Sequence, residues 1–92
     1  MYAVKPTTRF SKDLKRAEKR GYKIDLLTAV IKKLAAGEPL DAKYQDHPLK
    51  GNYEGCRECH ITPDWLLIYE IADRELILYL TRTGTHSDLF GR

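Results

Sequence analysis

Apolar residues recur at helical spacing through the first third of the chain and predict two consecutive helices. A short strand is expected at residues 2–4, after which Thr7-Thr8 offers an N-terminal cap for the first helix and Gly21 a stop. The second helix is expected over about residues 24–36, with Gly37 following it. The apolar positions that share one face are Phe10, Leu14 and Ala17 in the first helix and Ile24, Leu27, Ile31 and Leu34 in the second. The two helices therefore form a hairpin.

The second half of the chain changes to short apolar runs that are typical of strands. These runs lie at residues 53–62, 65–71 and 76–83. Short polar connections separate them, which favours an antiparallel meander. The segment Trp65–Tyr69 is apolar almost throughout and predicts a central strand, covered by the helices on one face and partly covered on the other. Residues 38–52 carry Pro and Gly and predict an irregular connection with His47 in a loop.

Length and composition indicate a single globular domain. The 92 residues are 42% hydrophobic and 32% charged, and no run approaches the roughly 18 apolar residues that a membrane-spanning helix needs. The opening residues lack the basic, apolar and small-residue succession of a secretory signal, so the expected compartment is the cytoplasm. We expect one α+β domain over residues 1–92, with an N-terminal strand and a helical hairpin packed on an antiparallel-dominated sheet in the order β-α-α-β-β-β.

Charge is distributed unevenly along the chain. Residues 1–36 hold ten Lys or Arg and three acidic residues, whereas residues 37–92 hold six and ten. A basic surface gains affinity for a polyanion by releasing the cations condensed on a phosphate backbone. The first third is therefore expected to face RNA or an acidic partner protein, although any single cation there can equally serve to solvate the outer face of a helix.

The run Cys56-Arg57-Glu58-Cys59-His60 matches the C-x-x-C-H pattern of covalent haem attachment, but its setting argues against a cofactor. Residues three apart in a strand point to opposite faces of the sheet, so the two thiols would diverge. A zinc site would need a second closely spaced ligand pair, which the sequence lacks. We therefore expect two reduced cysteines, with no metal and no cofactor.

The chain has three histidines, His47, His60 and His86, each among polar and turn-forming residues. Histidine gives and accepts protons near neutral pH and is the commonest general acid or base. Strand topology brings the end of the first meander strand, with His60 and then Asp64, toward the third strand, with Arg82 and then His86. Because the second meander strand runs between these two strands, topology alone does not fix the distance from His60 to His86. Taken singly, each histidine is more commonly a structural residue: His47 in a turn, His60 in a strand and His86 in a loop near the C-terminus.

Histidine, aspartate and arginine side chains together suit the cleavage of RNA without a metal. One group removes the 2′-hydroxyl proton while another protonates the leaving 5′-oxygen, and an arginine fork stabilises the charge on the phosphate. Trp65 and Phe90 can stack on bases, although an apolar core or a C-terminal anchor explains them equally well. The sequence contains neither a nucleophile elbow nor a phosphate-cradling glycine loop.

Several spaced segments resemble bacterial type II toxins of the RelE/ParE superfamily, and specifically its YafQ branch. The similarity spans nearly the whole chain, and its most specific parts are Phe10-Ser11-Lys12-Asp13, Tyr44–Gly51, His60–Tyr69 and Arg82-Thr83-Gly84-Thr85-His86 with Leu89-Phe90. The resemblance implies a RelE-like microbial ribonuclease fold. It also implies a ribosome-dependent endoribonuclease that cleaves mRNA in the ribosomal A site, inhibits translation, and is held inactive in a hetero-oligomer with a cognate antitoxin.

The resemblance also implies a set of site residues. The set comprises His86, His60, Asp64 and His47, with Arg82, Trp65 and Phe90 toward the substrate. In this assignment His86 is the general acid, and His60 or Asp64 is the base or its orienter. His47 helps to bind or polarise the substrate, and Arg82 stabilises the phosphate.

Two other functions are compatible with parts of the sequence. ParE-like relatives share the fold but inhibit growth through gyrase without nuclease chemistry, so fold alone does not decide between the two. A small metal or haem carrier built on Cys56–His60 is the other alternative. It would bring colour or stoichiometric metal with the purified protein.

Overall fold

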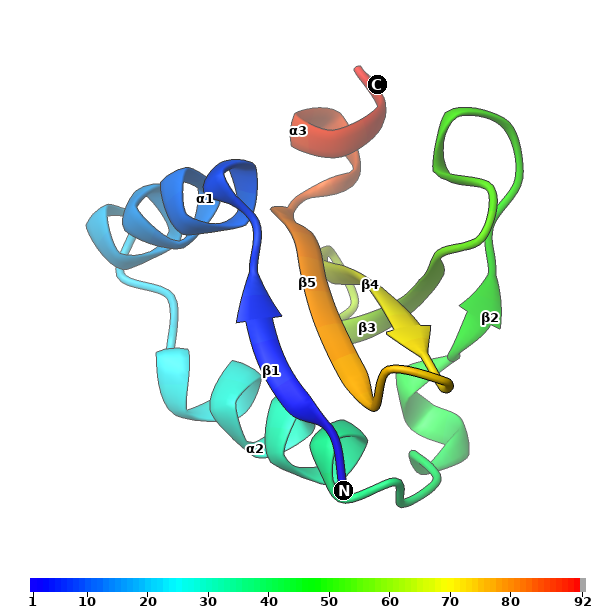
Figure 1. Ribbon diagram of the computed structural model, residues 1–92. Helices are drawn as coiled ribbons and strands as arrows, with labels where there is room; N and C mark the ends of the chain where they lie inside the picture. The colour runs from blue at the N-terminus through cyan, green and yellow to red at the C-terminus, as the bar shows by residue number, and fades with distance from the viewer. Residues whose placement is uncertain (92) are drawn as a thin grey trace.

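A five-stranded mixed sheet forms the centre of the computed structural model, which describes residues 1–91 of the chain (Figure 1). The strands are β1 (Ala3–Pro6), β2 (His47–Pro48), β3 (Arg57–Thr62), β4 (Trp65–Ala72) and β5 (Ile77–Gly84), in the spatial order β1-β5-β4-β3-β2. β1 pairs with β5 in parallel, and the other neighbours are antiparallel. The predicted α+β fold with an antiparallel-dominated sheet is confirmed.

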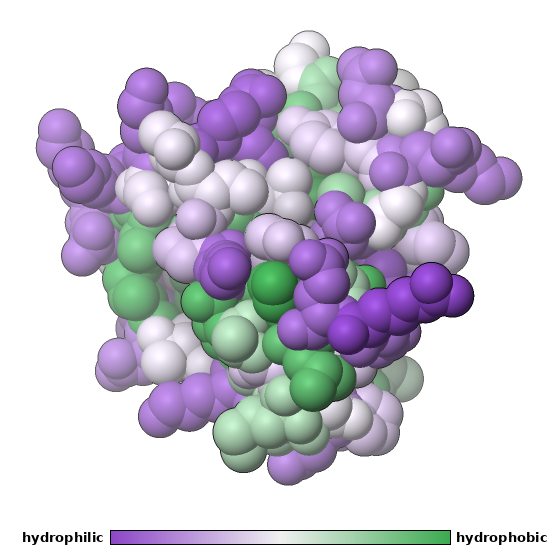
Figure 2. Space-filling view, viewed as in Figure 1, coloured by the Kyte–Doolittle hydropathy of each residue, from purple (hydrophilic) through white to green (hydrophobic). Residues whose placement is uncertain are grey.

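The helices α1 (Thr8–Lys19) and α2 (Ile24–Ala35) form the predicted hairpin. The hydroxyl of Thr7 caps α1 by accepting a hydrogen bond from the backbone N–H of Phe10. Each helix is followed by a glycine in the left-handed conformation, Gly21 at φ +79° and Gly37 at φ +77°, which a residue without a side chain adopts freely. Figure 2 shows hydrophilic side chains over the outer surface of α1, in agreement with the basic character of this part of the chain.

The larger apolar core lies between the two helices and one face of the sheet. Leu27 of α2 is 1% exposed, and Leu67 and Leu78 of the sheet are fully covered. Burying each such side chain contributes about 1.5–3 kcal/mol relative to leaving it in water. Packing of the helical hairpin therefore fixes the strands that carry the polar groups of the opposite face.

A smaller apolar cluster covers that opposite face. Leu66 and Ile68 of β4 pack there against Cys56 and against Leu89 of α3 (His86–Phe90). Every residue from Trp65 to Tyr69 is at most 3% exposed, because alternate residues face the larger core and the smaller cluster. The predicted central strand with two covered faces is confirmed.

The ladder between β4 and β5 changes register near the point where β1 ends. Leu80 and Arg82 pair with adjacent residues of β4, the latter with Ile68, so Thr81 has no partner on that strand. The hydroxyl of Thr7 donates a hydrogen bond to the Thr81 carbonyl at 2.8 Å and satisfies this group. As a result Leu80 lies in the larger core, whereas Arg82 lies opposite Ile68 on the face of the smaller cluster.

The connection between α2 and β3 is more ordered than its sequence indicates. It contains two short 3-10 helices, η1 (Ala42–Tyr44) and η2 (Gly51–Tyr53). His47 lies in β2, paired with Glu58, and the prediction that it sits in a loop is wrong. A two-residue strand is too short to show a period of two, so no sequence pattern reveals it. The strand predicted from residue 53 begins at Arg57, since the 3-10 helix occupies its start.

The helix α3 is absent from the predicted order of elements. The signal for it lies in Thr85 and Asp88, which have the spacing of a capping box at a helix start. None of the helices within residues 1–91 has the length and apolar character needed to cross a lipid bilayer.

A buried ion pair joins α1 to the end of β5. Asp13 accepts hydrogen bonds from Nε and Nη2 of Arg82 at 2.7 and 3.0 Å, so both carboxylate oxygens hold the guanidinium. β1 pairs with β5 only as far as Leu80, and beyond that point Asp13 also accepts from the backbone N–H of Thr83 at 3.2 Å. The side chains of Asp13 and Arg82 are 4% and 9% exposed. One carboxylate therefore neutralises a buried cation and replaces the missing strand at the edge of the sheet.

The variant Asp13→Ala is expected to lower the free energy of unfolding by about 3–5 kcal/mol, because it leaves a buried guanidinium without its carboxylate. Urea unfolding followed by circular dichroism measures this loss. Lys12→Ala, at the exposed neighbouring position, is the control and should stay within about 0.5 kcal/mol of the wild type. A loss below about 1 kcal/mol for Asp13→Ala would show that other groups satisfy Arg82.

Candidate active site

The three histidines lie in one row on the face of the sheet that carries the smaller cluster. The ring centroids of His47 and His60 are 6.4 Å apart, and those of His60 and His86 are 5.7 Å apart. His47 pairs with Glu58, which precedes His60 by two residues and shares its face of β3. The ladders align His60 with Gly84 across β4, and the chain reaches His86 directly after that point. Sheet pairing therefore gathers three imidazoles from distant segments.

A buried carboxylate lies between two of these imidazoles. Glu58 is 4% exposed, and its Oε1 is 3.6 Å from Nε2 of His47 and 3.5 Å from Nε2 of His60. A proton on either imidazole turns the contact into an ion pair. Glu58 is missing from the predicted site, although its position two residues before His60 in a strand places it on the same face.

Asp64, in the turn between β3 and β4, holds the ring of His86. Its Oδ1 is 2.8 Å from Nδ1 of His86 and accepts a hydrogen bond from the backbone N–H of the same residue at 3.3 Å. These hydrogen bonds hold the pKa of the Asp64 carboxyl below its usual range, so the group is a carboxylate near neutral pH. Because a carboxylate only accepts, the contact assigns the proton of a neutral ring to Nδ1 and leaves Nε2 for other partners.

A second carboxylate anchors the short helix that carries His86. Asp88 accepts from the backbone N–H of Thr85 at 2.9 Å, and the Thr85 hydroxyl accepts from the N–H of Asp88 at 3.1 Å. Arg20, the residue that follows α1, donates to the same carboxylate at 2.6 and 3.1 Å and holds the pKa of Asp88 far below its usual range. Glycine is required at residue 84, because a Cβ there would lie 2.9 Å from the Cβ of Asp88. α3 is thereby attached to α1 as well as to the sheet.

Arg82 and Phe90, two of the residues predicted to face the substrate, line one groove of about 660 Å³. Asp13 fixes the guanidinium of Arg82, and the remaining Nη1 lies 3.5 Å from the hydroxyl of Tyr53. Phe90 is 38% exposed, and its ring meets that of Tyr53 edge-on with the centroids 5.9 Å apart. The groove therefore presents a fixed cation and an aromatic ring beside the helix that carries His86.

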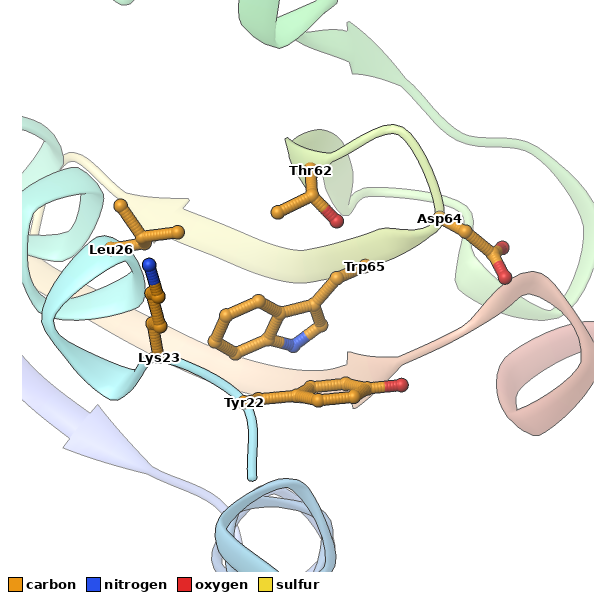
Figure 3. Close-up of a pocket in the computed structure, with 6 residues that line it drawn as sticks. All are labelled: Tyr22, Lys23, Leu26, Thr62, Asp64 and Trp65. Carbon is orange, nitrogen blue, oxygen red and sulfur yellow. The ribbon is translucent and has the colours of Figure 1, made fainter. Parts of the chain in front are cut away.

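Trp65 lies in the core, so the prediction that it stacks on a base is wrong. The residue is 3% exposed, its indole N–H donates to the hydroxyl of Thr83 at 2.9 Å, and the ring of Tyr22 covers it at a centroid distance of 5.0 Å. Figure 3 shows the two rings at the wall of a pocket of about 260 Å³, with Asp64 directed away from them. A large aromatic ring whose N–H already has a partner suits an interior position, and its faces are not open to a ligand.

The two cysteines lie on opposite faces of the sheet, and the prediction that their side chains diverge is confirmed. Cys56 belongs to the smaller cluster and Cys59 to the larger core, and both thiols are free and buried. Burial raises the pKa of the Cys59 thiol to about 12, which keeps it protonated and unreactive. The pair has no common side on which to hold a haem or a zinc ion.

A different set of side chains has the spacing of metal ligands. Within residues 1–91 it comprises Glu58, His60 and His86, whose ligand atoms lie within 4.8 Å of one another. Two imidazoles and one carboxylate suit a transition metal, and three protein ligands leave a coordination position open. The residues therefore fit an ion, and two of them are imidazoles of the histidine row.

Comparisons with known proteins find relatives over nearly the whole chain. Residues 2–91 match the family described as a bacterial toxin of type II toxin–antitoxin systems, YafQ. The chain is 45% identical over 83 residues to the mRNA interferase toxin YafQ of Escherichia coli K12, a match that covers 89% of this chain and 88% of the relative. It superposes with a TM-score of 0.88 on a chain of the E. coli DinJ–YafQ toxin–antitoxin complex, at 41% identity and with 98% of each chain covered. A metal-bound toxin from Helicobacter pylori gives a TM-score of 0.92 at 47% identity, covering 98% of this chain and all of that one.

The variant Asp88→Asn is expected to destabilise the protein at neutral pH, by less than Asp13→Ala does, because it removes the charge opposite Arg20 while keeping a polar cap. Folding lowers the pKa of Asp88, so its stabilisation is complete above the pKa of an unfolded aspartate, about 3.9, and is lost as the pH falls below that value. The difference in unfolding free energy between wild type and variant should therefore shrink between pH 7 and about pH 3, which urea unfolding measures. Ser87→Ala in the same helix is the control. A difference that stays constant over this range would exclude the ionised carboxylate as its source.

Proposed function

The chain belongs to the YafQ family of bacterial type II toxins, and on this premise we propose that it is an mRNA interferase, a ribosome-dependent endoribonuclease that cleaves mRNA in the A site and inhibits translation. The observation that carries the proposal is the row of His47, His60 and His86, whose neighbouring ring centroids are 6.4 and 5.7 Å apart, beside Asp64 and Arg82. Such a set supplies the proton transfers and the positive charge that cleavage of a phosphodiester requires. Its substrate places the activity in the cytoplasm.

In this proposal His60 and His86 divide the proton transfers. His60 accepts the proton of the 2′-hydroxyl as that oxygen attacks phosphorus, and the imidazolium that forms lies 3.5 Å from the carboxylate of Glu58. His86, with a proton on both ring nitrogens, donates its Nε2 proton to the 5′-oxygen as the bond from phosphorus to that oxygen breaks, and it keeps the Nδ1 proton toward Asp64. The products are a 2′,3′-cyclic phosphate and a free 5′-hydroxyl, so no water is consumed in the step.

Asp64 serves as the orienter of His86. Its lowered pKa makes the carboxylate a weak base, and its hydrogen bond to Nδ1 presents Nε2 of the ring to the leaving group. Arg82 is suited to the charge that develops on the non-bridging oxygens, since Asp13 holds the guanidinium in place before the substrate arrives. His47, on the other side of Glu58 from His60, would bind or polarise the substrate.

The ribosome and a cognate antitoxin are the proposed partners. Ten Lys or Arg in residues 1–36, together with the hydrophilic outer surface of α1 in Figure 2, suit ribosomal RNA or an acidic protein. In E. coli, DinJ and YafQ form a toxin–antitoxin complex, and we infer a hetero-oligomer of that kind for this chain.

A ParE-like inhibitor of gyrase is the alternative within the same fold. It would arrest growth through DNA damage, and the three histidines would be dispensable. Inducing the protein in cells and measuring both mRNA cleavage ends and the DNA-damage response separates the two functions. Cleaved mRNA without a damage response supports the nuclease, and the reverse supports the alternative.

The variant His86→Ala is expected to reduce cleavage of ribosome-bound mRNA by roughly 10²–10⁴-fold, because the leaving 5′-oxygen loses its proton donor. Primer extension on mRNA in a purified translation system, with and without ribosomes, measures the cleavage. Folding, followed by circular dichroism, and binding of the antitoxin should be retained, and Ser87→Ala should cleave as the wild type does. Full nuclease activity in His86→Ala would remove this residue from its role as the acid.

Metal binding by Glu58, His60 and His86 would make the imidazole nitrogens unavailable for proton transfer. Adding Zn²⁺ is expected to shift the NMR signals of the His60 and His86 rings, and Glu58→Gln should raise the Zn²⁺ concentration needed by roughly tenfold or more. Cys56→Ala is the control and should leave the titration unchanged, since the thiols take no part. Shifts that depend on Cys56 and not on Glu58 would assign the metal to the cysteine segment instead.

A further inference from the structure

The groove beside α3 collects positive charge from three separate segments. Arg9 of α1, Lys50 after β2 and Arg82 of β5 all line it. Arg9 and Lys50 are exposed, and neither forms an ion pair with any acidic side chain in residues 1–91. Asp88 also borders the groove, but its carboxylate already accepts hydrogen bonds from α1 and from the cap of its own helix. Two uncommitted cations and one fixed cation therefore face the same space.

Aromatic and amide groups lie among these cations. The ring of Phe90 is partly exposed and is supported edge-on by Tyr53, and Asn52 adds an amide to the wall. Cations that follow a phosphate backbone, combined with rings on which bases stack, are the means by which proteins bind single-stranded nucleic acid. The chemistry of the groove thus fits a nucleotide and not a purely anionic ligand.

The groove also adjoins the histidine row. Phe90 follows His86 by one turn of α3, and the ladders align Arg82 with Glu58 across Ile68 of β4. If the scissile phosphate of an RNA strand lies against the histidine row, the next part of that strand on the side of α3 can enter the groove.

Two further grooves lie at the site, one lined by Asp64 and the other by His60, and each has one cation. One groove combines Lys23 with the carboxylate of Asp64, and the other is lined by Lys43, whose Nζ lies 5.2 Å over the ring of Tyr44. Each of these grooves offers one cation where the groove beside α3 offers three, and the cation over the ring of Tyr44 is already partly engaged. The groove beside α3 is therefore the better match for RNA.

We propose that Arg9, Lys50 and Phe90 form a second RNA subsite, which takes a nucleotide flanking the scissile phosphate. Arg9 and Lys50 neutralise the phosphate of that nucleotide, and Phe90 stacks on its base. The subsite rests on the nuclease function proposed above and extends it to residues outside the histidine row.

The test measures binding of a single-stranded RNA whose 2′-hydroxyls are methylated, so that it cannot be cleaved. Fluorescence anisotropy on the full chain, from about 50 to 200 mM salt, gives the affinity and its salt dependence. Arg9→Ala/Lys50→Ala should weaken binding and reduce the slope of log K against log salt by roughly 0.7, since one neutralised phosphate in a single strand contributes about that amount. Phe90→Leu should weaken binding roughly tenfold without changing the slope. The charge-matched control Lys23→Ala/Lys43→Ala should bind within about twofold of the wild type.

A second measurement follows cleavage of ribosome-bound mRNA. The Arg9→Ala/Lys50→Ala variant should raise KM and leave kcat within a few-fold, because its residues contact a flanking nucleotide and not the reacting atoms. Three results would overturn the subsite: no RNA binding by the wild type at about 50 mM salt, an unchanged slope in Arg9→Ala/Lys50→Ala, or an equal loss in the control. If the wild type binds RNA with the expected slope but leaves ribosome-bound mRNA intact, the nuclease proposal fails while the groove remains an RNA site.

Discussion

The ion pair between Asp13 and Arg82 is the interaction on which the rest of the arrangement depends. β1 leaves β5 at Leu80, and the end of β5 would otherwise present unpaired backbone groups at an open edge of the sheet. Asp13 fills that gap from α1 and holds the Arg82 guanidinium with the same carboxylate. One buried charge therefore sets the position of α1, completes the last strand and immobilises the guanidinium of Arg82.

The main helices and strands could be predicted from the sequence because burial imposes a period on each of them. A residue such as Leu27 or Leu67 must face the core, and its neighbours in the pattern follow. The register shift at Thr81 could not be predicted, since its carbonyl is satisfied by Thr7, 74 residues away. The strand β2 could not be predicted either, because a two-residue strand is defined by its pairing with β3, here with Glu58, and not by a sequence pattern of its own.

The candidate site, too, could be predicted only in part from the sequence. The histidines and Asp64 could be selected because few residue types carry protons near neutral pH, and sheet pairing brings them together. Residue type alone does not place Trp65, because a tryptophan can pack in a core as well as stack on a nucleotide base. Its hydrogen bond to Thr83, seen only in the folded chain, shows that it lies in the core. Glu58 was not predicted as a site residue because most acidic residues lie on the solvated surface. Its burial becomes visible only in the folded chain.

α3 is a helix of five residues, and its position is set by partners outside itself. Leu89 rests on the smaller cluster, and Asp88 is grasped by Arg20 near the far end of α1. The imidazole of His86 is therefore linked through α3 to the C-terminal end of α1. Displacing Arg20 from Asp88 would therefore loosen α3 and, with it, the position of the His86 ring.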